Sequence, residues 1–185
     1  SEEAPAAAEP AEAPAESGRF AIQLGSYVSK DEAQRLKFWS GRKNAFPASG
    51  RISPDYMCMD STIPRKRLAD ILLAIQAMEQ RYGLRCANVF HAGDGNLHPL
   101  ILYNCNDPVE AAKAEEAGND ILKLCVDVGG CLTGEHGVGI EKRDLMTRQF
   151  TTADLHQQMR VRAAFDTQWL LNPAKVFPLE GRIAS

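Results

Sequence analysis

Between residues 56 and 133, the spacing of apolar residues alternates between the period of a strand and that of a helix. Apolar residues recur every three or four positions after Pro64, at Leu68, Ile71, Leu72, Ile75 and Met78. This spacing predicts an amphipathic helix that begins at Pro64 and ends at Gly83. A second long helix is predicted from Pro108, capped by Asp107, to Val128, where two glycines follow.

Short apolar segments at residues 56–60, 84–90, 97–103 and 131–133 predict four strands around these helices. The resulting order is strand, helix, strand, strand, helix, strand, which is typical of a ferredoxin-like split βαβ layer. We therefore predict an α+β fold in which both helices pack on one face of an antiparallel sheet. A Gly-rich loop at 134–139 and helical segments over 141–165 follow this layer.

The N-terminal part has a different pattern. Residues 1–17 consist only of Ala, Glu, Pro and Ser, which predicts a disordered, extended tail over 1–18. Residues 20–28 alternate as a short strand does, and Ser29 begins a predicted helix that runs to about residue 36. Residues 19–36 resemble the opening of a SPOR domain, a peptidoglycan-binding module, and form either a fragment of one or a linker. The main domain is expected over 37–180.

Composition narrows the class of protein. The chain has 185 residues, 44% of them hydrophobic and 24% charged, which is ordinary for a soluble domain. The net charge of −3 gives no electrostatic case for nucleic acid or an anionic membrane. No apolar stretch approaches the ~20 residues of a membrane span. The first residues do not follow the basic, apolar and small-residue pattern of a secretory leader, so secretion is not expected. The five cysteines form no C-x-x-C pair, so we expect reduced thiols. The expected location is the cytoplasm, with a peripheral position at the inner membrane as the alternative.

The most informative motif is the segment from His91 to His98, which flanks a Gly-Asp-Gly turn. If the two histidines pair across this hairpin, their Cβ atoms lie about 4.5–5.5 Å apart on one face, close enough to ligate one ion. Glu135, between Gly134 and His136, completes a set of two histidines and one carboxylate. Such a set suits zinc, manganese or iron and leaves positions open for a substrate.

Several neighbouring residues allow more than one interpretation. Asp94 is expected to stabilise the turn by bonding nearby amides. Asn96 either hydrogen-bonds a substrate or caps the returning strand. Glu135 and His136 either divide the roles of ligand and base or form a solvated loop pair. Arg42 either clamps a substrate carboxylate or belongs to a solvated charge pair with Lys43, and His156 is expected to be an exposed helical residue.

Five segments together resemble one family. They are residues 41–47, 50–56, 88–99, 134–142 and 170–175. They are similar to the C-terminal domain of FAD-linked 2-hydroxyacid oxidases and dehydrogenases of the glycolate oxidase type. One departure from the family pattern is Ala174, which replaces a glycine. The FAD-binding domain of these enzymes is not found in this sequence, so FAD is expected on another domain or subunit, and the isolated chain is expected to be inactive.

The resemblance also implies a role for each matched residue. It implies that a divalent metal (zinc, manganese or iron) is held by His91, His98 and Glu135. It implies that His136 is the base on the substrate hydroxyl and that Arg42 binds the substrate carboxylate. Asn172 and Lys175 would lie in a closing motif near the flavin. The implied partners are a flavin-domain subunit and an iron–sulfur subunit.

Three functions are therefore considered. The first is the substrate- and metal-binding part of a flavin-dependent dehydrogenase that oxidises a 2-hydroxy acid, such as glycolate or D-lactate, to the 2-oxo acid. The second is a non-catalytic, envelope-associated protein that binds peptidoglycan through residues 19–36. The third is a metal-dependent hydrolase, because a site of two histidines and a glutamate also activates water. The motifs favour the first.

Overall fold

The computed structural model describes residues 32–91 and 93–179. The predicted tail and the strand expected at 20–28 lie outside these residues. The helix expected to end near residue 36 instead continues as α1, Glu32–Ser49. Its sequence has no regular three-and-four apolar repeat, so the pattern gives no sign of this extension. Ala45 and Ser49 are the buried positions of its last turns.

The sheet is built around the central strand β4, Asn96–Tyr103. On one side lies β3, Arg85–His91, and on the other lie β1, Asp55–Cys58, and β2, Ser61–Thr62, all antiparallel to β4. β1 and β2 share one register and form a single extended segment interrupted at Met59 and Asp60. The interruption lies opposite Pro99, whose carbonyl accepts the Met59 amide at 3.0 Å but which has no N–H to return the bond.

A fourth position in the sheet is filled by Cys131, which forms an antiparallel bridge with Thr62. The strand expected at 131–133 is therefore reduced to one bridge. The resulting spatial order is Cys131, the β1–β2 segment, β4 and β3. This is the order of a ferredoxin-like split βαβ layer, so the predicted α+β fold is confirmed.

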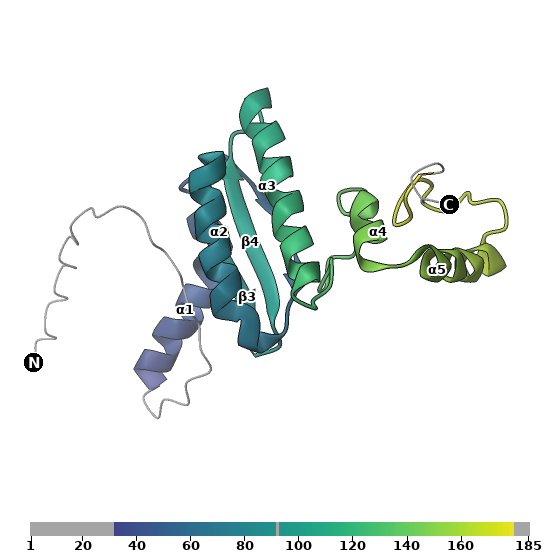
Figure 1. Cartoon of the computed structure of the whole chain (residues 1–185). Coiled ribbons are helices and arrows are strands. Elements are labelled where there is room, and N and C mark those ends of the chain that lie inside the picture. Colours follow the sequence, from purple (N-terminus) through teal and green to yellow (C-terminus); the bar gives the residue numbers. More distant parts are fainter. Residues whose placement is uncertain (1–31, 92, 180–185) are drawn as a thin grey trace, which may run out of the picture.

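Two helices lie side by side on one face of this sheet (Figure 1). A single 3-10 turn, Arg65–Arg67, leads into α2, Leu68–Tyr82, which ends at Gly83 with a left-handed φ of 68°, as predicted. α3, Pro108–Asp127, is capped by Asp107, whose carboxylate accepts the Val109 and Glu110 amides. The core between helices and sheet contains Ile71, Ile75, Leu97, Ile101, Ile121 and Leu122. Burial of each such side chain stabilises the fold by about 1.5–3 kcal/mol.

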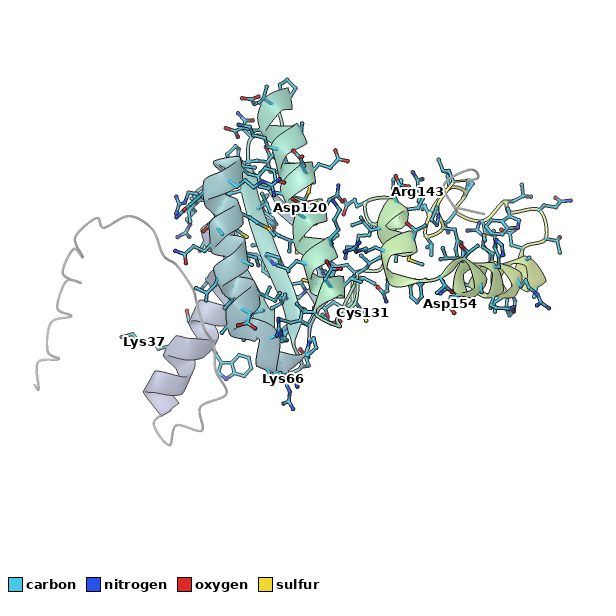
Figure 2. The ribbon with its side chains drawn as sticks, viewed as in Figure 1. Lys37, Lys66, Asp120, Cys131, Arg143 and Asp154 are labelled. Atoms are coloured by element: carbon cyan, nitrogen blue, oxygen red, sulfur yellow. The ribbon has the colours of Figure 1, made fainter. Side chains whose placement is uncertain are left out.

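After the sheet layer the chain forms a C-terminal arm, residues 141–179. It contains a 3-10 turn, Arg143–Leu145, and two helices, α4, Met146–Gln149, and α5, Thr152–Phe165. The arm extends away from the sheet, and Figure 2 shows Arg143 and Asp154 on it, apart from Asp120 on α3. Among the described residues, no helix is both long and apolar enough to cross a bilayer.

The two faces of the sheet differ in chemistry because successive side chains of a strand alternate between them. Leu97 and Ile101 of β4 belong to the core under the helices. Asn96 and His98 therefore face the opposite side, together with His91, the partner of Asn96 on β3. The candidate site lies on this face.

Candidate functional site

The β3–β4 hairpin brings His91 and His98 to one face of the sheet, but not directly opposite each other. His91 pairs with Asn96, and His98 pairs with Val89, because β3 ends at His91 and β4 begins at Asn96. The predicted direct pairing of the two histidines is therefore wrong, since they are diagonal neighbours. Their rings still meet edge to face, with centroids 5.4 Å apart.

The turn itself is built as the sequence predicts. The Asp94 carboxylate accepts the Asn96 amide at 3.0 Å, which confirms its expected role in the turn. Gly95 has a φ of 83°, and a Cβ on it would lie 2.2 Å from the Ile63 carbonyl oxygen. Only glycine satisfies both conditions, so the close approach of the hairpin to residue 63 depends on it.

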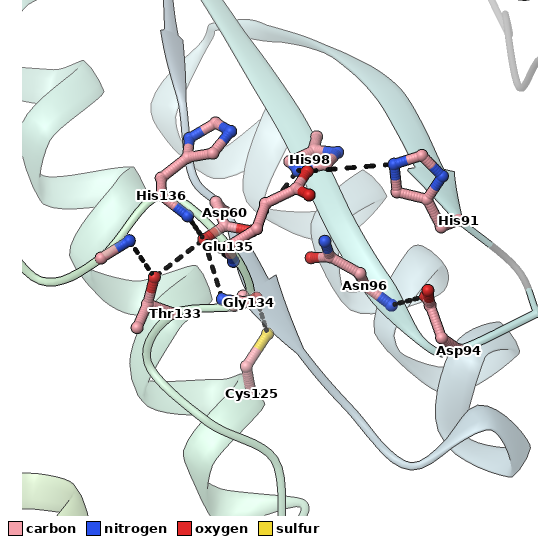
Figure 3. Close-up of polar contacts among 12 residues, drawn as sticks. Asp60, His91, Asp94, Asn96, His98, Cys125, Thr133, Gly134, Glu135 and His136 are labelled. Atoms are coloured by element: carbon pink, nitrogen blue, oxygen red, sulfur yellow. Dashed lines mark hydrogen bonds and ion pairs between the residues drawn. The ribbon is translucent and has the colours of Figure 1, made fainter.

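The loop that follows Cys131 brings Glu135 and His136 to the same face (Figure 3). Glu135 Oε1 lies 3.0 Å from His98 Nε2 and 3.9 Å from His91 Nε2. The His136 ring stacks on the His98 ring with centroids 5.1 Å apart. The structure thus brings together the three residues expected to bind metal and the one expected to act as base.

Asp60 is a member of this cluster that the sequence reasoning missed. Continuing the register of β1 and β2 places it opposite His98, and its Oδ1 lies 3.4 Å from His98 Nε2. Its Oδ2 accepts the Thr133 hydroxyl and the amides of Gly134, Glu135 and His136 at 2.8–3.0 Å. The only sequence signal was a carboxylate at the end of an apolar strand.

Hydrogen bonding keeps Asp60 ionised. Burial by itself raises the pKa of this carboxyl, but the amide of His136, the Thr133 hydroxyl and the other amides outweigh it and hold the pKa well below its usual range. Lys142, also missed, is buried beside it and donates from Nζ to the Asp60 carbonyl. Burial lowers the pKa of Lys142, and the Asp60 charge opposes that shift.

Several buried polar atoms of the cluster have no hydrogen-bond partner among the described residues. They are His98 Nε2, Asp60 Oδ1 and Asn96 Oδ1. Burial lowers the pKa of His98, against the opposing charges of Asp60 and Glu135, so its imidazole is neutral near pH 7 and offers a lone pair. A buried nitrogen lone pair beside carboxylate oxygens suits a divalent cation such as zinc, manganese or iron as a ligand set.

Two overlapping sets of side chains could hold such a cation. One ligand atom from each of Asp60, His98, Glu135 and His136 lies within 4.8 Å of the others. The set expected from the sequence is His91, His98 and Glu135, so it has His91 in place of Asp60 and His136. The His91 side chain is 41% exposed. His98 and Glu135 belong to both sets. These two side chains are therefore the geometric centre of the candidate site.

The other predicted site residues lie around or outside the cluster. Asn96 is buried beneath the loop, where a Cβ on Gly134 would lie 2.3 Å from its Oδ1. Arg42 lies in α1, and its side chain is outside the described part. Asn172 and Lys175 are exposed in the arm.

The arm segment that carries Asn172 and Lys175 reaches the loop at 134–139 through its backbone. The Val176 amide donates to the Gly139 carbonyl at 2.8 Å. Within the described residues, no hydrogen bond or ion pair joins the Asn172 or Lys175 side chain to the histidine cluster. His156 is exposed on α5, as predicted.

Comparison with known proteins agrees with the motifs. Residues 2–176 match the family model of the C-terminal domain of FAD linked oxidases. Over 157 residues the chain is 57% identical to the glycolate oxidase subunit GlcD of Escherichia coli K12, covering 85% of this chain and 32% of that protein.

Two further relatives are more distant. The glycolate oxidase subunit GlcD of Bacillus subtilis 168 is 31% identical over 88% of this chain and 34% of its own length. The mitochondrial cytochrome-type D-lactate dehydrogenase of Kluyveromyces lactis is 32% identical over 81% of this chain and 27% of its own length. The chain thus spans roughly a third of the length of these curated relatives. By the match over nearly its whole length, this chain belongs to the FAD-linked oxidase family, through the C-terminal domain of that family.

Proposed function

We propose that this chain is the substrate- and metal-binding part of an FAD-dependent dehydrogenase that oxidises a 2-hydroxy acid to the 2-oxo acid. The observation that carries the proposal is the buried His98 Nε2, which has no hydrogen-bond partner among the described residues and lies 3.0 Å from Glu135 Oε1. The relatives' names point to glycolate and D-lactate as substrates of those proteins. A small 2-hydroxy acid is accordingly the proposed substrate class.

In this proposal His98 and Glu135 hold a divalent metal together with His91. The neutral imidazole of His98 and the carboxylate of Glu135 are suitable ligands, and His91 approaches Glu135 from the other side. When bound, zinc, manganese or iron would act as a Lewis acid that polarises the hydroxyl and carboxylate of the substrate and lowers the hydroxyl pKa.

His136 is the proposed general base. Its side chain is exposed while its ring stacks on His98, so it faces a substrate that approaches the cluster from solvent. Oxidation removes one proton from the hydroxyl and one hydride from Cα, and His136 takes the proton. FAD, when bound, would supply the acceptor for that hydride. Arg42 orients the substrate carboxylate, and Asn172 and Lys175 contact the flavin.

The proposed setting is a complex of subunits. The Escherichia coli and Bacillus subtilis relatives are each named as a subunit of glycolate oxidase. We therefore propose that this chain works in the cytoplasm with a flavin-bearing part and an iron–sulfur subunit. The family and the relatives' names favour this oxidoreductase over the peptidoglycan-binding and hydrolase alternatives.

Metal analysis tests the proposal directly. The purified chain is loaded with Zn²⁺ or Mn²⁺, desalted and analysed for metal beside the double variant His91→Ala/His98→Ala. The wild type is expected to retain a stoichiometric amount of metal and the double variant to lose it. His156→Ala, which removes an exposed histidine on α5, is the matched control and should bind like the wild type.

Equal metal content in the wild type and the double variant would remove the basis for the site. A second measurement addresses the substrate: glycolate and D-lactate are titrated calorimetrically into the metal-loaded chain. Binding that requires both the metal and Arg42, as judged by Arg42→Ala, is the expected result. Binding that is unchanged without the metal would contradict the proposed chelation.

A further inference from the structure

The Asp60 carboxylate joins the sheet to the loop that carries two of the site residues. One of its oxygens, Oδ2, accepts four hydrogen bonds, all from residues of the segment 133–136. These bonds span 73 to 76 positions of sequence, from the interruption between β1 and β2 to the loop beyond Cys131. Hydrogen bonds to an ionised acceptor are about twice as strong as neutral ones, so these four bonds attach the loop firmly to the sheet.

We propose that Asp60 is the positioning residue of the site, which fixes the 133–136 turn on the sheet so that Glu135 and His136 meet His98. Asp60 acts through the backbone amides of both residues, because the Glu135 amide donates to it at 3.0 Å and the His136 amide at 2.9 Å. Placing the two amides fixes where both side chains begin. The part of this inference that concerns metal binding rests on the proposed function.

Two neighbours make this attachment possible. Gly134 allows the loop to lie against the sheet, since a Cβ on it would be 2.7 Å from Asp60 Oδ1. Lys142 supplies a buried positive charge, with its Nζ 3.5 Å from Asp60 Oδ2, so the ionised carboxylate is not left without a counter-charge. Both residues come from the same segment, 134–142, that Asp60 holds.

The remaining oxygen of Asp60 faces the candidate metal position. Oδ1 lies 3.4 Å from His98 Nε2, and neither atom has a hydrogen-bond partner among the described residues. A fixed negative charge at this place favours a cation bound at Nε2, because the surrounding protein screens it less than water does. Asp60 thus combines two effects: it orders the loop, and its charge favours the metal.

The test compares Asp60→Asn with the wild type by two measurements. The first is amide hydrogen exchange at Gly134, Glu135 and His136, which we expect to become about tenfold faster or more in the variant. The second is the affinity for Zn²⁺ or Mn²⁺ by calorimetry and the visible spectrum of the Co²⁺ form. Affinity is expected to fall roughly 10- to 100-fold, as for other residues that orient metal ligands.

Asp166→Asn is the matched control. Asp166 is another buried carboxylate that accepts backbone amides, those of Leu170 and Leu171, but it lies in the C-terminal arm. It should leave both exchange at 134–136 and metal affinity unchanged. Thr133→Val removes one of the four donors. It should also speed exchange at 134–136 and lower metal affinity, but by less than Asp60→Asn does. If Asp60→Asn does not fold, Thr133→Val takes its place in the test.

The outcomes separate the two proposals. Unchanged exchange at 134–136 in both Asp60→Asn and Thr133→Val would overturn the positioning role, as would an equal loss of metal affinity in Asp166→Asn. A wild type that binds no divalent metal would contradict the proposed function. In that case the exchange data still decide whether Asp60 holds the loop.

Discussion

Gly134 lies where the loop that carries Glu135 and His136 touches the sheet. A Cβ at this position would lie 2.3 Å from Asn96 Oδ1 and 2.7 Å from Asp60 Oδ1, both oxygens of buried side chains. Real Cβ atoms do not approach oxygen atoms this closely, so any side chain must push the loop outward. At the scale of single residues, the missing side chain of Gly134 is thus as important for the site as the ligand side chains.

Gly134→Ala is accordingly expected to displace the loop, to weaken metal binding and to lower the free energy of unfolding by about 1–3 kcal/mol through overpacking. Calorimetric metal titration and denaturant unfolding measure the two effects. Gly93→Ala is the control, because no atom lies within 4 Å of its Cβ position. If both variants bind metal like the wild type, the close approach of the loop is not required.

At the scale of elements, α2 and α3 are joined by a polar contact beside their apolar one. The Tyr82 hydroxyl of α2 donates to Asp120 of α3 at 2.7 Å, and Arg81 donates to the same oxygen at 3.3 Å. The Tyr82 bond, against a smaller opposing effect of burial, lowers the pKa of Asp120, and the same bond raises the pKa of Tyr82 to about 12. The contact therefore favours the ionised carboxylate and the protonated phenol.

This contact predicts an acid-dependent contribution to stability. Because the pKa of Asp120 is lower in the folded than in the unfolded chain, its contribution is complete above the unfolded value of 3.8 and is lost as pH falls through the lowered folded value. Asp120→Asn should therefore destabilise the protein at pH 7 and have a smaller effect near pH 3, as measured by urea unfolding.

Asp70→Asn serves as the control for that experiment, because Asp70 is an exposed carboxylate of α2 that pairs with Arg67 at 3.3 Å. A destabilisation by Asp120→Asn that is equal at both pH values would show that the Tyr82 contact does not favour the ionised form.

At the scale of the whole molecule, the sheet layer and the C-terminal arm differ in how much apolar surface they bury. α3 buries six residues along its length, whereas α5 buries Leu155 and leaves Phe165 86% exposed. The arm contacts the sheet layer through Met146 and Leu155, which belong to the same buried cluster as the core, and through Arg148, whose guanidinium donates to the Asp127 carboxylate at 2.7–2.8 Å. Because both partners are exposed, this pair adds little to stability.

The arm is therefore expected to open locally without unfolding of the sheet layer. Amide exchange under native conditions should be faster over 152–165 than over 108–127, because α5 has few buried contacts to break. Leu155→Ala should accelerate exchange in α5 further and leave α3 unchanged. Equal protection of the two helices in the wild type would show that the arm is part of the same cooperative unit.

Local patterns were sufficient for most of the fold. Apolar spacing and Gly83 place α2, and the Asp107 cap with the two glycines after Val128 places α3, each to within a few residues. Both signals are local, because caps and amphipathic faces depend on neighbours within one or two turns. The length of α1 was not predictable, since its sequence has no apolar repeat. The division of one strand into β1 and β2 also requires knowledge of its partner, because Pro99 in β4 causes it.

The sequence by itself determined the class of fold, the motifs shared with the FAD-linked oxidases and four residues of the histidine cluster. Only the tertiary structure decided the diagonal relation of His91 and His98, and the parts played by Asp60 and Lys142. The physical reason is that strand register and burial come from residues far apart in the chain. A carboxylate at the end of an apolar strand becomes the anchor of a loop more than 70 residues away only when the sheet brings them together.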